Sequence, residues 1–146
     1  MTTRLTPNFT LEELTHSQTA VRRGIKNEAN PVIKNNLTIV AANMEKVRAL
    51  LGNNPIAINS GYRNLEVNRL TGGSSKSAHM EGWAVDFTCH RFGTPAKIVD
   101  AIKASDIMFD QLIEEGTWVH ISFAPTKRRQ VLKATFKNGK ASYTIY

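Results

Sequence analysis

The chain has 146 residues, of which 41% are hydrophobic, and a formal net charge of +7. This length suits one hydrophobic core, so we treat residues 1–146 as a single domain. No apolar run approaches the roughly 18 residues of a membrane-spanning helix, and the N-terminus lacks the apolar stretch of a signal peptide. We therefore expect synthesis in the cytoplasm and no membrane insertion. The single cysteine, Cys89, excludes an internal disulfide.

The positive charge favours a polyanionic partner, and both nucleic acid and the bacterial cell wall are polyanions. The basic residues are scattered, apart from small clusters at Arg22-Arg23 and at 127–129. No recognition helix, zinc finger or RNA-binding signature accompanies them. We therefore expect no nucleic-acid partner and favour the cell wall, although charge alone does not separate the two.

Helix signals come first along the chain. A Thr-x-x-Glu capping box predicts a short helix over 11–15. Residues 16–30 are polar and aperiodic, and we interpret them as a loop with room for one turn of helix. Asn30-Pro31 predicts a second helix start, and the apolar spacing of 3 and 4 that follows predicts a helix ending at Gly52.

Strands and helices alternate in the rest of the chain. In order, the sequence predicts a strand over 55–59, a turn and helix over 60–70, a flexible loop over 71–76, a strand over 83–88, a helix from Thr94-Pro95 to about Ser105, and strands over 109–115 and 117–123. Asn138-Gly139 predicts a C-terminal hairpin over about 131–146. This order indicates an α+β fold, with helices packed on a mainly antiparallel sheet.

Most of the chemical information lies in two segments, Ser-Ala-His-Met-Glu-Gly-Trp-Ala-Val-Asp at 77–86 and Trp-Val-His at 118–120. Together they offer two imidazoles and one carboxylate. Three N/O ligands without a thiolate form the ligand set of a catalytic zinc site, in which the fourth position stays open for water. We therefore predict that His79, Asp86 and His120 bind Zn²⁺.

The alternation of side chains along the two strands supports a close approach of these three residues. Alternate side chains of a strand share a face, so Asp86 lies on the face away from the apolar Val85. His120 likewise lies on the face away from Val119. His79 precedes its strand in a loop rich in Gly and Ser, which could fold it back over Asp86.

The pattern Ser-x-His-x-x-Gly-x-Ala-x-Asp followed by Trp-x-His resembles the zinc D-Ala-D-Ala carboxypeptidases and the related phage L-alanyl-D-glutamate endopeptidases. Ser-Gly-Tyr-Arg at 60–63, Val67-Asn68 and Gly-Gly-Ser at 72–74 are also similar to that family, and the likeness is clearest from about Phe9 to Phe123. It implies a zinc peptidase that cuts peptidoglycan stem peptides, with its zinc site on the sheet. Either the D-Ala-D-Ala or the L-Ala-D-Glu bond fits these motifs.

The same resemblance implies a phage-type lysis enzyme. Such a monomeric enzyme would be made in the host cytoplasm and act on the bacterial cell wall after release. The family has a catalytic acidic residue just upstream of the second His. If the family pattern is aligned on the preceding apolar residues, its acidic residue falls at Glu115. If the pattern is aligned on His120, the acidic residue falls at Glu114. We choose Glu115 as the proton-transfer residue.

The resemblance also supplies substrate contacts. Arg63 matches the arginine of Ser-Gly-Tyr-Arg, so we expect it to bind the substrate carboxylate or the scissile carbonyl and to stabilise the oxyanion. Ser77 resembles a substrate-contacting residue, although a turn-forming serine is the plainer interpretation. Trp118 could form a wall of the pocket or simply pack. His16 and His90 have no motif partner, and we treat both as non-ligands.

Three other functions remain as alternatives. A non-catalytic cell-wall-binding or virion structural module of the same fold would need no complete site, yet all three ligands, Arg63 and an acidic candidate are present. A nucleic-acid binder is suggested by charge alone. A Ser or Cys hydrolase has the weakest support, because Cys89 adjoins His90 without a nucleophile motif or a third, orienting group.

Overall fold

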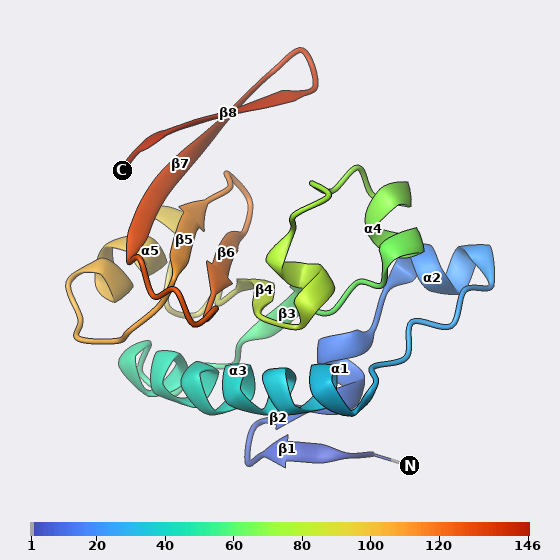
Figure 1. The fold of residues 1–146 in the computed structure, drawn as a ribbon. Helices are drawn as coiled ribbons and strands as arrows, with labels where there is room; N and C mark the ends of the chain where they lie inside the picture. The colour runs from blue at the N-terminus through green and yellow to red at the C-terminus, as the bar shows by residue number, and fades with distance from the viewer. Residues whose placement is uncertain (1) are drawn as a thin grey trace.

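A six-stranded sheet organises the fold in the computed structural model, which describes residues 2–146 (Figure 1). The strands, in their order across the sheet, are β3 (Ala57–Ser60), β4 (Ala84–Thr88), β6 (Val119–Ser122), β5 (Gln111–Glu114), β7 (Gln130–Lys137) and β8 (Lys140–Ile145). Neighbouring strands pair antiparallel except β5 and β7, which are parallel. The predicted α+β class with a mainly antiparallel sheet is therefore confirmed, and the parallel pair was not predicted.

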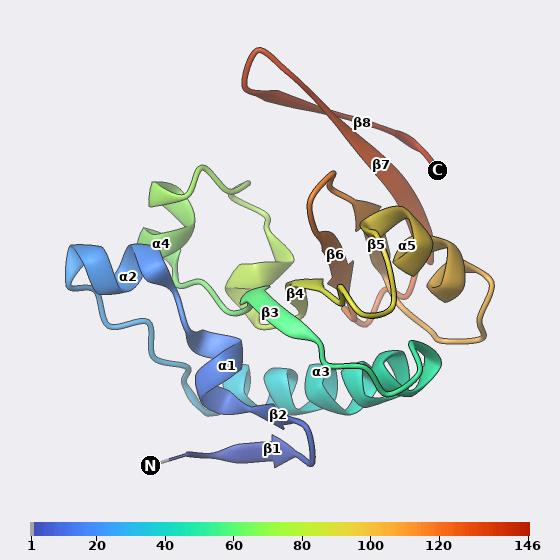
Figure 2. The same ribbon diagram turned by 180° about the vertical axis from the view of Figure 1, so that it is seen from behind.

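Helices α1 (Leu11–Thr15), α3 (Pro31–Leu50) and α5 (Pro95–Lys103) bury one face of this sheet (Figures 1 and 2). Helices α2 (Gln18–Arg23) and α4 (Leu65–Leu70) pack against each other beside it. The core joins Met44 of α3 and Ile102 of α5 to Val85 and Ile121 of the central strands, all with no exposed surface. Because side chains alternate along a strand, the neighbours of these core residues project to the other face of β4 and β6.

The two longest helices begin where their caps predict. The Asn30 side chain accepts a hydrogen bond from the Ile33 N–H at 2.8 Å, and Pro31 lies in the first turn of α3. Helix α5 begins after the Thr94 cap and ends at Lys103, two residues earlier than predicted. In the described part of the chain, no helix has both the length and the hydropathy to cross a membrane.

The N-terminal region differs most from the prediction. Strands β1 (Arg4–Thr6) and β2 (Phe9–Thr10) form a short ribbon, which is too brief to leave a periodic pattern in the sequence. Helix α2 lies inside the segment that we interpreted as a loop with room for one turn of helix, and it is six residues long. Its caps specify it, since the Ser17 side chain accepts from the Ala20 N–H and Gly24 adopts φ 66°.

The C-terminal hairpin projects beyond the body of the molecule (Figure 1). Strands β7 and β8 are joined by Asn138 and Gly139, which adopt φ angles of 52° and 75°. Two positive φ angles are the mark of a type I′ turn, whose twist matches that of the flanking strands. The parallel pairing of β7 with β5 attaches this hairpin to the sheet.

Candidate metal centre

Strand register brings two of the predicted ligands together. Strands β4 and β6 pair antiparallel with Asp86 directly opposite His120. Directly opposed residues project to the same face, with their Cβ atoms about 5 Å apart. Their sequence neighbours Val85 and Ile121, also an opposed pair, face the core. Asp86 and His120 therefore lie on the strand faces that the alternation of side chains predicted.

A single turn of 3₁₀-helix, η1 (Ala78–Glu81), delivers the third residue, His79. The Ser77 side chain accepts a hydrogen bond from the His79 N–H at 3.2 Å and begins this turn. Gly82 ends it with φ 75°, and a Cβ at this position would lie 3.0 Å from the Ile33 side chain of α3. The turn therefore packs closely against α3, and it directs the His79 side chain toward β4.

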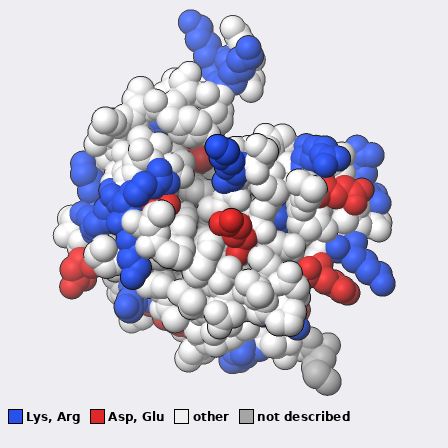
Figure 3. Space-filling model, in the orientation of Figure 1, with Lys and Arg blue, Asp and Glu red and all other residues white. Residues whose placement is uncertain are grey.

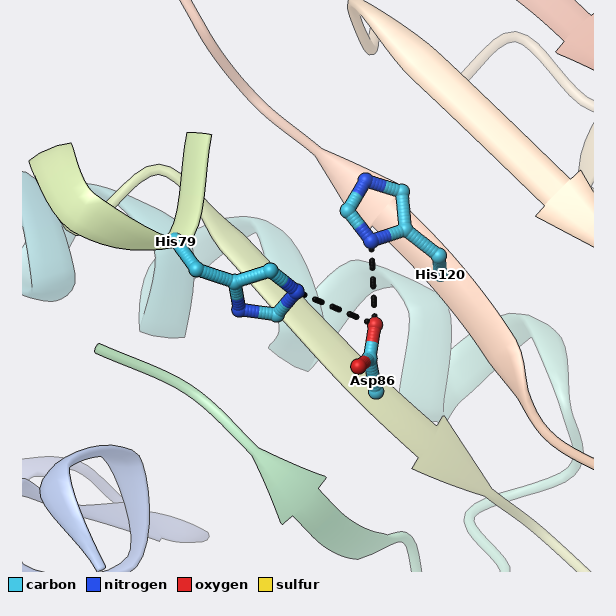
Figure 4. A group of neighbouring side chains, drawn as sticks. All are labelled: His79, Asp86 and His120. Carbon is cyan, nitrogen blue, oxygen red and sulfur yellow. Dashed lines mark hydrogen bonds and ion pairs between the residues drawn. The ribbon is translucent and has the colours of Figure 1, made fainter. Parts of the chain in front are cut away.

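The three side chains converge on one carboxylate oxygen (Figure 4). Asp86 Oδ1 lies 3.2 Å from His79 Nε2 and 2.9 Å from His120 Nδ1. Within the residues that the structure describes, one possible ligand atom from each of the three lies within 4.8 Å of the others. Their side chains are between 3% and 14% exposed, so the cluster is largely shielded from water.

The second nitrogen of His79 fixes the ring. His79 Nδ1 donates to the Gly61 carbonyl oxygen at 2.7 Å, because a carbonyl oxygen is an acceptor only. In the neutral imidazole, Nε2 then carries a lone pair, and it faces the Asp86 carboxylate, which is also an acceptor. Two acceptors directed at one space require a cation between them. A metal ion satisfies this arrangement, and a backbone carbonyl behind a ligating histidine is a recurrent feature of metal sites.

The protonation states of the cluster also favour a bound metal ion. Burial lowers the pKa of His79, which favours the neutral imidazole that a metal requires. Burial alone would raise the pKa of Asp86. Protonated neighbouring histidines, His79 first, outweigh it and hold that pKa well below its usual range, so the carboxylate stays ionised. Where the imidazoles are neutral, a bound cation would supply the same positive charge. The site therefore offers two imidazole nitrogens and one carboxylate oxygen, which is a donor set that suits a divalent transition metal.

Of the two candidate acids, Glu114 is the last residue of β5, and Glu115 lies in the turn that follows it. Ile113 pairs with His120 and Glu114 pairs with Val119, so Glu114 projects away from the metal ligands. Its carboxylate accepts from the Gly116 N–H at 2.8 Å and lies 3.9 Å from Lys133 Nζ. Glu115 lies one residue further on and lines the same cavity as His120. Burial raises the pKa of Glu115, and the Asp86 charge adds to this increase.

Arg63 lies across the cavity from the strands. Its backbone N–H donates to the His79 carbonyl oxygen at 3.1 Å, which links Arg63 to η1. Its guanidinium makes long hydrogen bonds to Thr71 and Ser77, at 3.4 and 3.3 Å. Burial lowers the pKa of Arg63, while the charges of Asp86 and Glu115 raise it. Among the described residues no carboxylate pairs with it, and its buried Nε has no hydrogen-bond partner.

The remaining predicted residues have clear places. Ser77 caps η1 and supports Arg63, so the turn-forming interpretation describes its contacts, and it also lines the cavity. Trp118 lines the cavity, and its indole N–H is buried without a partner in the described chain. Cys89 is buried in the core and lies outside the cavity. His16 and His90 are not part of the cluster.

Sequence reasoning missed the role of the Gly61 carbonyl. A Cβ on Gly61 would overlap the carbonyl oxygen of Leu14, and the next N–H, from Tyr62, donates to that same oxygen at 2.7 Å. Only glycine permits this close approach of β3 to α1, which positions the acceptor for His79. The Ser-Gly-Tyr-Arg motif contained the signal, but only the structure shows what the glycine does.

Fold and cavity together define an α+β protein with one candidate mononuclear metal site. The family model for Peptidase M15 matches residues 7–122, and the chain belongs to this family. Over 79 residues it is 32% identical to the zinc D-Ala-D-Ala carboxypeptidase of Streptomyces albus G. That match covers 54% of this chain and 30% of the carboxypeptidase, so the two proteins are alike over a minority of the longer one.

Proposed function

We propose that this protein is a zinc-dependent peptidase that hydrolyses peptide bonds in the stem peptide of peptidoglycan. The observation that carries the proposal is the convergence of His79, Asp86 and His120 in a cavity that Glu115 and Arg63 also line. Membership of the Peptidase M15 family and the likeness to the zinc D-Ala-D-Ala carboxypeptidase of Streptomyces albus G support both the metal and the substrate class.

The donor set favours zinc over the metals that prefer oxygen ligands. His79 Nε2, His120 Nδ1 and an Asp86 carboxylate oxygen match the three protein ligands of catalytic zinc sites. When bound, zinc supplies a Lewis acid that makes water nucleophilic near neutral pH and polarises a carbonyl group.

Glu115, which lines the cavity, is the proton carrier that we propose for this reaction. Its carboxylate accepts a proton from the attacking water and later delivers it to the nitrogen of the departing amine, which would otherwise leave as an unstable anion. A proton carrier works best when its pKa is near the working pH. Burial moves the pKa of Glu115 in that direction.

Arg63 Nε and the Trp118 indole N–H are hydrogen-bond donors without a partner among the described residues. The Arg63 guanidinium can donate to the terminal carboxylate of a stem peptide or to the scissile carbonyl oxygen as negative charge develops there. The buried Trp118 indole N–H can donate to a peptide carbonyl. Because a buried donor without a partner is costly, a ligand that satisfies both gains binding energy.

The test digests purified Gram-negative sacculi with zinc-loaded protein and identifies the products by mass spectrometry, with and without a chelator. Release of a terminal alanine would identify a carboxypeptidase, and cleavage between alanine and glutamate or at the crosslink would identify an endopeptidase. His90→Ala, which changes a histidine outside the cluster, serves as the control. A protein that binds zinc and sacculi but releases no product would be the non-catalytic module, and the proposal would be wrong.

A further inference from the structure

The C-terminal hairpin presents one face to the candidate active site. Residues of β7 and β8 alternate between two faces, and the pairing of Phe136 with Ala141 fixes which residues share a face. Four residues on one of these faces also line the active-site cavity, namely Leu132, Phe136, Ala141 and Tyr143. We call these four residues the hairpin face. Phe136 and Tyr143 are each 52% exposed, so about half of each aromatic side chain is available to a ligand.

The hairpin face and the metal centre belong to one cavity of about 840 Å³. The Phe136 ring lies beside the turn that follows Glu115, since a Cβ on Gly116 would be 3.7 Å from its Cε2 atom. Tyr143 lines the same cavity as Asp86 and Glu115, so a ligand larger than the scissile peptide contacts both regions.

Charge is divided between the two ends of this cavity. The lysines of the hairpin, Lys133, Lys137 and Lys140, fall on its opposite face by alternation, and Figure 3 shows basic side chains at the hairpin tip. The hairpin face itself carries no formal charge. Away from the hairpin face, charged residues of both signs line the cavity. Among them Arg63, which pairs with no carboxylate of the described residues, can bind a carboxylate of a ligand, and the neutral part of that ligand is left to the hairpin.

We propose that the hairpin face is a saccharide subsite, which binds the N-acetylated pyranose rings of the glycan strand beside the peptide being cut. The identity of this ligand rests on the proposed function. Stem peptides carry the carboxylates of peptidoglycan, and the amide-linked sugars are neutral. The C–H bonds of a pyranose ring pack against the electron-rich face of an aromatic ring. Small residues such as Ala141 beside Phe136 and Tyr143 leave these faces open.

The first test measures binding alone and needs neither zinc nor turnover. The probe is the neutral tetramer of N-acetylglucosamine, added to the metal-free protein while NMR follows the aromatic signals of Phe136 and Tyr143. We expect saturable shifts, and their loss in Phe136→Ala and Tyr143→Ala. Thr135→Ala and Ser142→Ala change the opposite face of the same hairpin and should bind normally. Absence of shifts, or equal shifts in all four variants, would overturn the subsite.

The second test compares two substrates with the same scissile bond, a disaccharide-linked stem peptide and the free stem peptide. We expect kcat/KM to be about tenfold higher for the linked peptide, mainly through KM, which is a plausible gain for two aromatic contacts. Phe136→Ala should reduce this preference for the linked peptide, whereas Thr135→Ala, which changes the opposite face of the hairpin, should retain it. Equal rates on both substrates in the native protein would count against the subsite.

The two proposals fail in different ways. If neither peptide is cut, the proposed function is wrong, and the tetramer titration still decides whether the hairpin face binds sugars. The competing occupant is a second copy of the chain, because β8 is an edge strand. A dimer in sedimentation experiments that dissociates in Phe136→Ala would show that the hairpin face is a protein interface, and the saccharide subsite would be rejected.

Discussion

The two halves of the sheet are built differently. All four residues of β6 are buried, and β6 has a paired strand on each side and helices behind it. All six residues of β8 are exposed, and β8 pairs on one side only. Two of the candidate metal ligands, Asp86 and His120, lie in the first region, and the hairpin face lies in the second. A metal centre needs ligand atoms held within tenths of an ångström, and only the fully packed half can supply that.

The exposed half is suited to a different task. A two-stranded hairpin that projects from the body has few buried contacts to lose when its surface residues change. It can therefore present a binding face without disturbing the metal centre. We expect substitutions in β6 to affect metal, catalysis and stability together, and substitutions in β8 to affect substrate preference alone.

The largest effect is expected from His120→Ala in the central half. Removal of a metal-ligating imidazole should abolish activity and lower zinc affinity by more than about 100-fold, since losing a residue that merely orients a ligand costs about 10–100-fold. Zinc content is measured by elemental analysis after dialysis, with His90→Ala as the matched control. Normal zinc content in His120→Ala would remove His120 from the ligand set.

Next in size is Glu115→Gln, which preserves shape and removes the proton acceptor. We expect kcat to fall by about 10²–10⁴-fold while zinc content stays unchanged. Glu114→Gln is the matched control, because its amide oxygen can still accept from the Gly116 N–H. An active Glu115→Gln enzyme together with an inactive Glu114→Gln enzyme would reverse our assignment.

Gly61→Ala tests the support behind His79. The added methyl group would overlap the Leu14 carbonyl oxygen and push β3 away from α1. We expect a loss of about 1–3 kcal/mol in the free energy of unfolding, with zinc affinity weakened by about 10–100-fold. Chemical denaturation and a zinc titration measure the two effects. Unchanged zinc affinity would separate the Gly61 carbonyl from the function of His79.

A smaller effect concerns the ionisation of Glu115. In the metal-free protein, burial should make Glu115 titrate above its ordinary value of 4.5, because burial disfavours the charged form. As the pH falls, Glu115 therefore becomes protonated, and unable to accept a proton, at a higher pH than an exposed glutamate does. Added zinc should lower this pKa, because a nearby positive charge favours the carboxylate. Carbon-13 NMR measures the titration, and Glu115→Gln identifies the signal. A pKa at or below 4.5 without metal would contradict the prediction.

The smallest effect is expected in the hairpin. Gly139→Ala places a side chain at φ 75° in open space, where nothing lies within 4 Å of the new Cβ. The cost is that of the left-handed conformation, about 1 kcal/mol, and it falls on a local turn. Hydrogen exchange of β7 and β8 should quicken while zinc content stays normal. Loss of zinc in Gly139→Ala would show that the two halves of the sheet are coupled.

The sequence predicted much of the site because its signals are local. Alternation along a strand placed Asp86 away from Val85, and caps such as Asn30 located the helix starts. The choice between Glu114 and Glu115 was harder, since counting from either side gave a different answer. Parity would have favoured Glu115, because Glu114 shares a face with the core residue Leu112. Our reasoning did not apply parity to that strand.

By itself, the sequence determined which residues can act as ligands, on which strand faces they lie, and where Asn138 and Gly139 turn the chain. These properties depend on residues a few positions apart. The tertiary structure decided that Asp86 lies opposite His120, that β7 joins β5 in parallel, and that the Gly61 carbonyl fixes the His79 ring. Such contacts link residues 18–34 positions apart, and they form only because burial of a shared core offsets the entropy of closing the loops between them.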